Sequence, residues 1–393
     1  MYRPDLAEAK DRPCSRGDAR AAVPVHMGIA GPEPAERRMV MAQHLELGLD
    51  TFGDVTSGAD GKALPHAQVI RNLVDEAVLA DEVGIDFIGV GEHHRDDFAV
   101  SAPEVVLAGM ASRTRRIRLG SAVTVLSSDD PIRVFQRFST VDALSNGRAE
   151  VILGRGSFTE SFPLFGFDLK DYETLFTEKL DLFAALLRDN GTPEGVTWQG
   201  SKRPPLVKQH VFPPIANGTL KTWVGVGGSP ESVVRAARYG LPLMLAIIGG
   251  NPGRFAPYVD LYHKAIEQLG GESLPVGVHS HGYVAETDEA ARAEFYDDYK
   301  RMHDRIGAER GWPAYGRDAF EREIEHGSLY LGSPETVARK IANTVKTLGA
   351  ARFDMKYSAG PLPHEKMMRC IELYGTRVIP RVREILAEEK VEA

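Results

Sequence analysis

Cysteine is scarce in this sequence, because the 393 residues include only Cys14 and Cys370. Two cysteines so far apart in the chain do not form the disulfide framework of a small secreted protein, and they fit a reducing cytoplasm. Long hydrophobic runs are also missing. The longest run, LPLMLAII at 241–248, is much shorter than the roughly 20 residues that span a bilayer. We therefore expect a cytoplasmic protein without a membrane partner.

An excess of positive charge is absent as well. Lys and Arg number 47 against 55 Asp and Glu, which gives a formal net charge of -8. No basic stripe runs along the chain, so nucleic acids and anionic membranes are not expected as partners. The composition, 43% hydrophobic and 26% charged, is that of a globular protein. The length suits two domains or one large α/β barrel.

Apolar periodicity is missing from the first forty residues, which are rich in Arg, Ala, Pro and Asp. Residues 1–42 lack the hydrophobic core of a secretory signal, and their acidic residues argue against an organelle transit peptide. We expect this segment to be a disordered tail. Alternatively, it is translated from a start codon that lies upstream of the true start at Met39 or Met41. The folded domain is then expected to cover 43–393.

Short β-rich runs alternate with amphipathic stretches of helical period from Gln43 onward. The runs that we predict as strands occupy 45–52, 85–92, 117–126, 148–157, 222–229, 241–248, 274–284 and 351–358. Eight strands with intervening helices is the count of a (β/α)8 TIM barrel. A doubly wound open sheet is the alternative, but no predicted strand is left without a helix. We also expect insertions after strands 4 and 7, at 158–219 and 304–330, which could cover a ligand.

Polar residues and two glycines lie in or just after most of the predicted strands. In a TIM barrel the carboxyl ends of the strands surround the active site, so these residues are expected around one mouth. They are Asp50, Glu92, His93, His94, Thr124, Arg155, Gly227, Gly228, His279, His281 and Lys356.

A glycine-rich turn joins the fifth predicted strand to a helix, in the stretch GVGGSPES at 225–232. Gly227 and Gly228 let the backbone approach a ligand closely, and Ser229 is well placed as the N-cap. Free amides and the helix dipole at such a terminus hold anions, so the turn predicts a phosphate site. Simple helix capping is the alternative. Arg155, between two glycines, suits bidentate phosphate binding, with a salt bridge to a neighbouring acid as its alternative.

Histidines occur in two pairs. Glu92 precedes His93 and His94, and an adjacent carboxylate can set the tautomer of an imidazole and raise its basicity. Two roles are open for these histidines: a catalytic one, and a structural one at the end of a strand. His279 and His281 share one strand face and resemble metal-ligand spacing, although a polar cavity lining is favoured. A metallohydrolase using these two histidines with Glu92 and His93 stays an alternative.

Five stretches in order resemble the luciferase-like flavin monooxygenases, over most of 43–385. They are Glu92-His93-His94, GSAVTVLSSDDPIRVFQ at 120–136, LSNGRAEVILGRG at 144–156, VGVGGSP at 224–230 and GLPLMLAIIGG at 240–250. The resemblance implies reduced FMN lying across the barrel mouth. His93 then matches the active-site base beside the isoalloxazine, and Glu92 an adjacent acid of the flavin site.

The same resemblance implies the remaining cofactor contacts. Arg155 matches a phosphate-binding arginine, and Gly227, Gly228 and Ser229 match the phosphate loop. Ala122 and Val123 fall where the family has a non-prolyl cis peptide under the flavin ring. Gly154 and the Val226-Gly227 pair replace a cysteine and a Glu-Ser pair of the luciferase branch, which argues against light emission.

The activity implied is oxygenation of a small organic substrate by reduced FMN and O2 through a flavin peroxide. Leu126, Ile247 and Ile248 are expected to keep the mouth dry. No nicotinamide fingerprint is visible, so a separate flavin reductase is an expected partner. A homodimer formed through helices near 103–145 is a further family expectation. A deazaflavin-dependent hydride transfer and a non-catalytic flavin-binding barrel stay open as alternatives.

Overall fold

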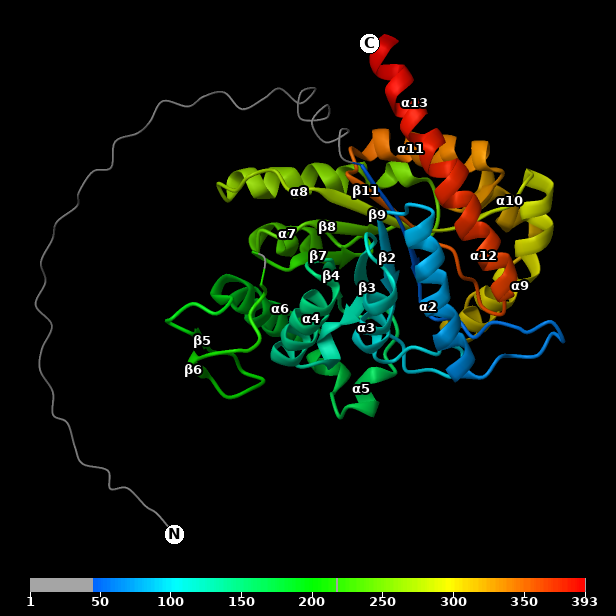
Figure 1. Ribbon diagram of the computed structural model, residues 1–393. Coiled ribbons are helices and arrows are strands. Elements are labelled where there is room, and N and C mark those ends of the chain that lie inside the picture. The colour runs from blue at the N-terminus through cyan, green and yellow to red at the C-terminus, as the bar shows by residue number, and fades with distance from the viewer. Residues whose placement is uncertain (1–44, 217, 393) are drawn as a thin grey trace, which may run out of the picture.

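Eight parallel strands close into a barrel in the computed structural model, which describes residues 45–216 and 218–392 (Figure 1). The expected tail at 1–42 lies outside the described residues. The strands are β1 (Glu46–Thr51), β2 (Phe87–Val90), β3 (Arg118–Val125), β4 (Ala149–Gly154), β7 (Lys221–Val226), β8 (Leu243–Ala246), β9 (Val276–Val284) and β11 (Arg352–Lys356). β1 pairs with β2 and β11, and the pairing of β8 with β9 completes the ring. The TIM-barrel prediction is confirmed.

Helices surround the strands, as Figure 1 shows. They are α2 (His66–Glu82), α3 (Pro103–Arg113), α4 (Pro131–Ser145), α6 (Tyr172–Asp189), α7 (Pro230–Arg238), α8 (Ala256–Gln268), α11 (Pro334–Leu348), α12 (His364–Leu373) and α13 (Ile379–Glu392). Local chemistry fixes several of their ends. The Asp130 carboxylate accepts from the first amides of α4, and the helix stops where Asn146 adopts a left-handed conformation with φ 59°.

The two predicted insertions contain more regular structure than expected. The segment 158–219 includes α6, which is the barrel helix after β4, so the true additions are α5 (Ser161–Leu164) and the hairpin of β5 (Val196–Trp198) and β6 (Leu206–Gln209). The segment 304–330 is not a loop. It contains the last two turns of α9 (Asp288–Arg310), then α10 (Arg317–Glu325), and ends at β10 (Tyr330–Gly332), which pairs with β9.

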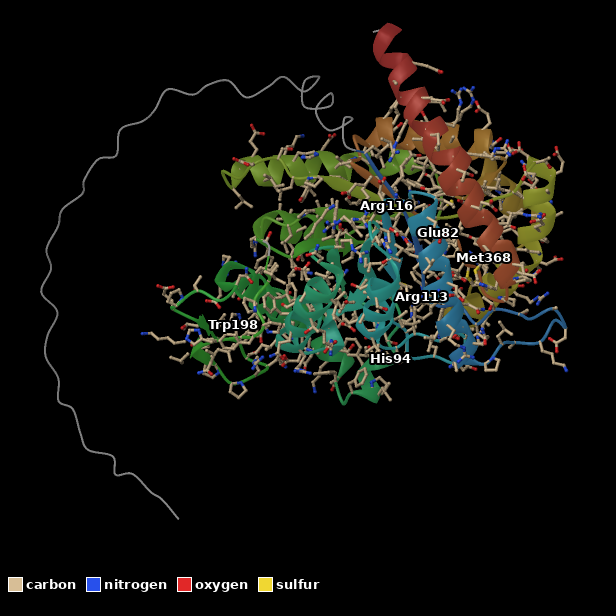
Figure 2. All side chains as sticks on the ribbon, viewed as in Figure 1. Glu82, His94, Arg113, Arg116, Trp198 and Met368 are labelled. Atoms are coloured by element: carbon tan, nitrogen blue, oxygen red, sulfur yellow. The ribbon has the colours of Figure 1, made fainter. Side chains whose placement is uncertain are left out.

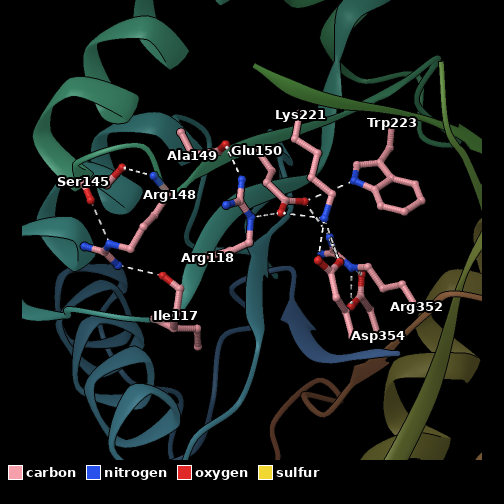
Figure 3. A network of polar contacts seen from close by, with 11 residues as sticks. Ile117, Arg118, Ser145, Arg148, Ala149, Glu150, Lys221, Trp223, Arg352 and Asp354 are labelled. Atoms are coloured by element: carbon pink, nitrogen blue, oxygen red, sulfur yellow. Dashed lines mark hydrogen bonds and ion pairs between the residues drawn. The ribbon is translucent and has the colours of Figure 1, made fainter. Parts of the chain in front are cut away.

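The interior of the barrel is filled on its amino-terminal side. An apolar cluster of Phe87, Ala122, Ile152, Trp223 and Met244 lies inside the ring of strands. A buried charge network lies beside it (Figure 3).

Arg352 is the centre of this network and is 0% exposed. Its guanidinium donates to Glu150 at 2.6 Å and to Asp354 at 2.9 Å, and it lies 3.5 Å from the centre of the Phe87 ring. Gly48 faces the same space, where a Cβ would lie 2.2 Å from an Asp354 oxygen. Because this end is packed shut, a ligand has room only at the carboxyl end of the strands.

Candidate active site

A cavity of about 360 Å³ opens at the carboxyl ends of the barrel strands. Its volume lies in the usual range for small-molecule sites, roughly 300–1,000 Å³. Most of the residues predicted for the mouth line it: Asp50, Glu92, His93, His94, Arg155, Gly227, His279, His281 and Lys356. Thr124 and Gly228 do not. The Thr124 hydroxyl is buried and donates to Ser121 at 2.8 Å, because its strand position faces away from the cavity.

The His93 ring is held among aromatic side chains. It stacks on Phe98 with ring centroids 4.3 Å apart, and Phe52 and Phe158 contact it at 5.1 and 5.0 Å. Its Nδ1 lies 3.6 Å from a carboxylate oxygen of Glu160. A titratable imidazole in an apolar cage with one acid beside it is an arrangement suited to controlled proton transfer.

Glu160 precedes α5 and was missed in the sequence, since nothing there connects it to a histidine 67 positions earlier. Burial alone would raise the pKa of its carboxyl, but contacts with His93 and with the His94 amide outweigh burial and lower this pKa. Glu160 is therefore an anion that orients His93.

Glu92 contacts His94 rather than His93. One carboxylate oxygen lies 3.0 Å from His94 Nε2, and the other accepts from the Val125 amide at 2.8 Å. The His94 ring meets Phe165 edge to face, directly after α5, and Figure 2 labels His94 at that end of the barrel. The expectation that Glu92 acts directly on the neighbouring imidazole thus applies to His94. Side chains of adjacent residues point apart, so His93 takes its acid from another segment.

The peptide bond between Ala122 and Val123 is cis, as expected, and both residues line the cavity. The pairing of β3 with β4 shifts register at this point. Two glycines leave room for the Val123 side chain. A Cβ on Gly154 would lie 2.5 Å from Val123 Cγ2, and one on Gly225 would lie 3.2 Å from Cγ1. Gly154 is therefore required by the shape of this wall.

The predicted phosphate end of the cavity contains an ion-pair bridge. The Arg155 guanidinium contacts the Glu173 carboxylate, and Arg235 on α7 donates to the same carboxylate at 3.1 Å. The alternative to phosphate binding by Arg155, a salt bridge to a neighbouring acid, is thus present. One carboxylate occupies the position between two guanidiniums that a phosphate would also fit.

Two buried donors next to this bridge have no hydrogen-bond partner among the described residues. They are the Ser232 hydroxyl and Nη1 of Arg235, both on α7. Ser229 caps this helix, Gly228 has φ +110°, and a Cβ on Gly227 would meet nothing within 4 Å. Ser232 is in the first turn of α7 and Arg235 is in its last turn. Buried unsatisfied donors are costly, so two of them on the helix that contacts Glu173 indicate space for an anion. In the sequence, Ser232 and Arg235 show only the pattern of an ordinary helix. Sequence reasoning therefore does not predict them as part of the site.

The apolar lining differs from the three residues expected. Ile248 lines the cavity, but Leu126 and Ile247 are 0% exposed and pack in the core outside the strands. Ile247 directly follows β8 and packs in the core, whereas its neighbour Ile248 is 56% exposed and faces the cavity. The cavity is covered instead by residues on and after α9, namely Met302, His303, Ile306, Arg310 and Trp312.

Metal ligation has no geometric support in this region. His279 and His281 line the cavity with ring centroids 6.3 Å apart. Across residues 45–216 and 218–392, no group of three or more His, Cys, Asp or Glu side chains is placed to hold a metal ion. The same part of the chain contains no helix long and apolar enough to cross a membrane.

The luciferase-like monooxygenase family model matches residues 51–352. The chain belongs to this family. Among its relatives, 4-hydroxyprotoasukamycin monooxygenase of Streptomyces nodosus subsp. asukaensis is 27% identical over 334 residues, covering 81% of this chain and 88% of that protein. Membership of this family, with relatives named as monooxygenases, supports an oxidoreductase.

Solved structures of luciferase-like proteins share the barrel. The oxygenating constituent of 3,6-diketocamphane monooxygenase from Pseudomonas putida, in complex with FMN, matches with TM-score 0.71 and 18% identity, covering 86% of this chain and 98% of that one. An F420-dependent secondary alcohol dehydrogenase with an F420-acetone adduct matches with TM-score 0.67 and 15% identity, covering 86% and 99%. At these identities the likeness establishes the fold.

Proposed function

We propose that this luciferase-like protein uses reduced FMN and O2 to oxygenate a small organic substrate. The observation that carries the proposal is the pair of unsatisfied donors on α7, Ser232 and Arg235. Ser232 and Arg155 line one end of a cavity with apolar and aromatic walls, and Arg235 is linked to Arg155 through Glu173. These residues fit the phosphate of FMN, and the cavity beyond them fits a flat ring system. The FMN-bound diketocamphane enzyme has the same barrel.

The phosphate would be held by Arg155, Arg235 and the Ser232 hydroxyl, with the N-terminus of α7 adding free amides and a favourable dipole. Glu173 must release both guanidiniums for this to happen. Its side chain is 58% exposed, so it can turn into solvent at little cost. Ala122 and Val123 would support the ring of the cofactor on the wall that their cis peptide shapes.

Bound reduced FMN would supply the electrons that activate O2. His93 would hold or move a proton at an imidazole nitrogen, with Glu160 orienting the ring and Phe98 fixing its plane. Glu92 would act indirectly, by fixing His94 and the end of β3 through the Val125 amide.

α9 and the residues that follow it would limit the entry of water into the cavity. Arg310 covers Phe158 at 4.7 Å and Trp312 at 5.3 Å, measured to the ring centres. Arg95, after β2, donates to both oxygens of Glu309 at 2.6 Å and so ties α9 to the barrel mouth. A closed, dry site protects reactive species from hydrolysis and strengthens its electrostatic interactions.

A second candidate is hydride transfer with a deazaflavin and no oxygen. The F420-dependent dehydrogenase matches the same share of this chain as the FMN-bound enzyme does, and an anion site at α7 serves either cofactor. The two candidates differ in cofactor selectivity, which the residues of the phosphate end do not set.

The supply of reduced FMN and the assembly of the protein are parts of the same proposal. A separate reductase would deliver the cofactor, since the turn at 225–230 lacks the spacing of a nicotinamide fingerprint. A homodimer would form through α3 and α4, where Val105 and Leu144 are 70% and 60% exposed. Size-exclusion chromatography with light scattering tests the dimer.

The cofactor is tested by titrating the purified protein with FMN, reduced FMN and F420. We expect selective binding of FMN forms, followed by O2 consumption and product formation with a panel of aldehydes, ketones, sulfonates and phenols. Selective tight binding of F420, without O2 consumption, would establish the second candidate instead.

A further inference from the structure

A second polar centre lies in the cavity on strands β1 and β9, outside the proposed cofactor contacts. Asp50 Oδ2 lies 2.5 Å from His279 Nδ1, and the Asp50 side chain is 1% exposed and that of His279 11%. Both residues line the cavity. Asp50 Oδ1 is buried without a hydrogen-bond partner, and His279 Nε2 makes no hydrogen bond to any described residue. The pair thus has unused hydrogen-bonding capacity on the cavity side.

The pKa of His279 depends on the groups that face its ring. Burial by itself lowers the pKa of His279, but the Asp50 carboxylate, by charge and by hydrogen bond, outweighs burial and raises this pKa. Asp354 on β11 acts in the same direction, and Lys356 opposes it. Lys356 is already engaged, because its ammonium group donates to Asp54 at 3.0 Å and to the Ser358 carbonyl at 2.6 Å.

The pKa values of the neighbouring histidines move in the opposite direction. His281, also on β9, is buried with its pKa well below the ordinary value, because of burial first and Lys356 second. Burial likewise lowers the pKa of His303 on α9. Of these three imidazoles, His279 is therefore the one whose protonated form is favoured, and in that form Nε2–H is left to donate.

Aromatic rings line the same cavity as His279. The Phe52 ring is nearly parallel to the imidazole, at 14° and 6.0 Å between centroids. Tyr299 contacts His281, and Trp312 contacts His303, on the side covered by α9. A planar aromatic ligand can stack on such rings or pack against them edge to face. A charged hydrogen-bond donor at one end of the cavity favours a ligand with an acceptor oxygen.

We propose that the Asp50–His279 pair binds the ionised hydroxyl of a phenolic substrate, with His279 Nε2–H donating to the phenolate oxygen. The proton lost from the hydroxyl passes to solvent on binding. Asp50 is a positioning residue, because it fixes the imidazole through Nδ1 and keeps Nε2 protonated. This inference rests on the proposed function, since a cofactor anchored at the α7 end leaves the part of the cavity beside Asp50 and His279 to the substrate.

The probe for the test is 4-nitrophenol, whose phenol and phenolate forms absorb at different wavelengths. The full chain, with and without oxidised FMN, is titrated with the probe across a range of pH. We expect the bound probe to ionise at a pH lower by about 1 than free 4-nitrophenol, the lower end of what a nearby opposite charge produces, because Asp50 offsets part of the charge. 4-Nitroanisole, which cannot ionise, is expected to bind at least tenfold more weakly.

Substitutions at Asp50 and His279 test whether these two residues cause the change in ionisation of the probe. His279→Gln is expected to abolish the change in ionisation, and Asp50→Asn to reduce it, with FMN affinity and circular dichroism unchanged in both. The matched control is His364→Gln, because His364 Nδ1 contacts Glu76 Oε1 at 2.8 Å in a histidine–carboxylate pair between α12 and α2, away from the cavity. The control is expected to behave as the wild type.

Three results would overturn the inference: no binding of 4-nitrophenol, an unchanged pKa of the bound probe, or a His279→Gln protein that keeps the change. If either variant fails to fold, the other and the nitroanisole comparison still decide. Failure of the proposed function is separate, since it shows as a wild-type protein that does not bind FMN while the probe still ionises at lower pH.

Discussion

The Glu173 carboxylate lies against the Arg155 guanidinium at the end of the cavity where α7 begins. Arg235 contacts the same carboxylate, so two cations converge on one exposed acid. A carboxylate between guanidiniums is chemically close to a phosphate in the same place. Glu173 therefore competes with the phosphate of any cofactor that binds there.

Removing the competing charge should strengthen cofactor binding. Glu173→Gln is expected to tighten FMN by up to about fivefold, which corresponds to about 1 kcal/mol, the usual limit for an exposed ion pair. Fluorescence titration of FMN measures it. Asp171→Asn is the control, because Asp171 pairs with Lys202 at 2.9 Å instead. Weaker FMN binding by Glu173→Gln would show that the acid supports the site.

Removing either guanidinium should have the opposite effect. Arg155→Ala and Arg235→Ala are each expected to weaken FMN by about 1.5–3 kcal/mol, the scale of a charged hydrogen bond. Isothermal titration calorimetry reports the affinity directly. Arg238→Ala tests specificity, because Arg238 is an exposed residue on the same helix. Wild-type affinity in the Arg155 variant would remove Arg155 from the phosphate site.

His93 and Glu160 should affect coupling rather than cofactor binding. His93→Ala is expected to keep FMN affinity but to release more hydrogen peroxide per FMN oxidised, because proton control at the reacting centre is lost. Glu160→Gln, which keeps the shape but removes the charge beside Nδ1, should shift the pH profile of coupling with a smaller loss of product. Product yield per FMN equal to the wild type in His93→Ala would exclude the residue from the mechanism.

The Asp50–His279 pair should make stability depend on pH. The pKa of His279 is raised above its ordinary value of 6.5 in the folded protein. Its contribution is therefore complete below that value and is lost as pH rises through the folded pKa. Urea unfolding at about pH 6 and about pH 9 should show a smaller decrease in stability for Asp50→Asn than for the wild type. Equal decreases would mean that the pair does not titrate in this range.

The closed end of the barrel should be intolerant of added volume. Gly48→Ala is expected to cost about 1–3 kcal/mol in the free energy of unfolding, because the new Cβ would meet the buried Asp354 carboxylate at 2.2 Å. Gly109→Ala inside α3 is the matched comparison, since its nearest neighbour would be 3.7 Å away and alanine favours the helix by roughly 1 kcal/mol. Urea denaturation of the two variants should give changes of opposite sign.

Much of the barrel could be predicted from local patterns. Near-continuous apolar runs such as 87–90 and 241–248 identified buried strands, and Pro, Ser and Asn marked helix ends such as those of α4 and α7. The boundaries of the two insertions were less accurate. The spacing of the strands alone predicts insertions at 158–219 and 304–330, although both segments also have a helical pattern.

The sequence by itself determined the strand count, the turn before α7 and the position of His93 at the end of β2, because these depend on residues close together in the chain. Only the tertiary structure determined which side chains contact each other. Glu160 rather than Glu92 reaches His93, Glu173 and Arg235 meet Arg155, and Asp50 meets His279 across 229 positions. The physical reason is barrel closure: it brings strand ends from the whole chain to one mouth, and only packing in three dimensions fixes which side chains face each other there.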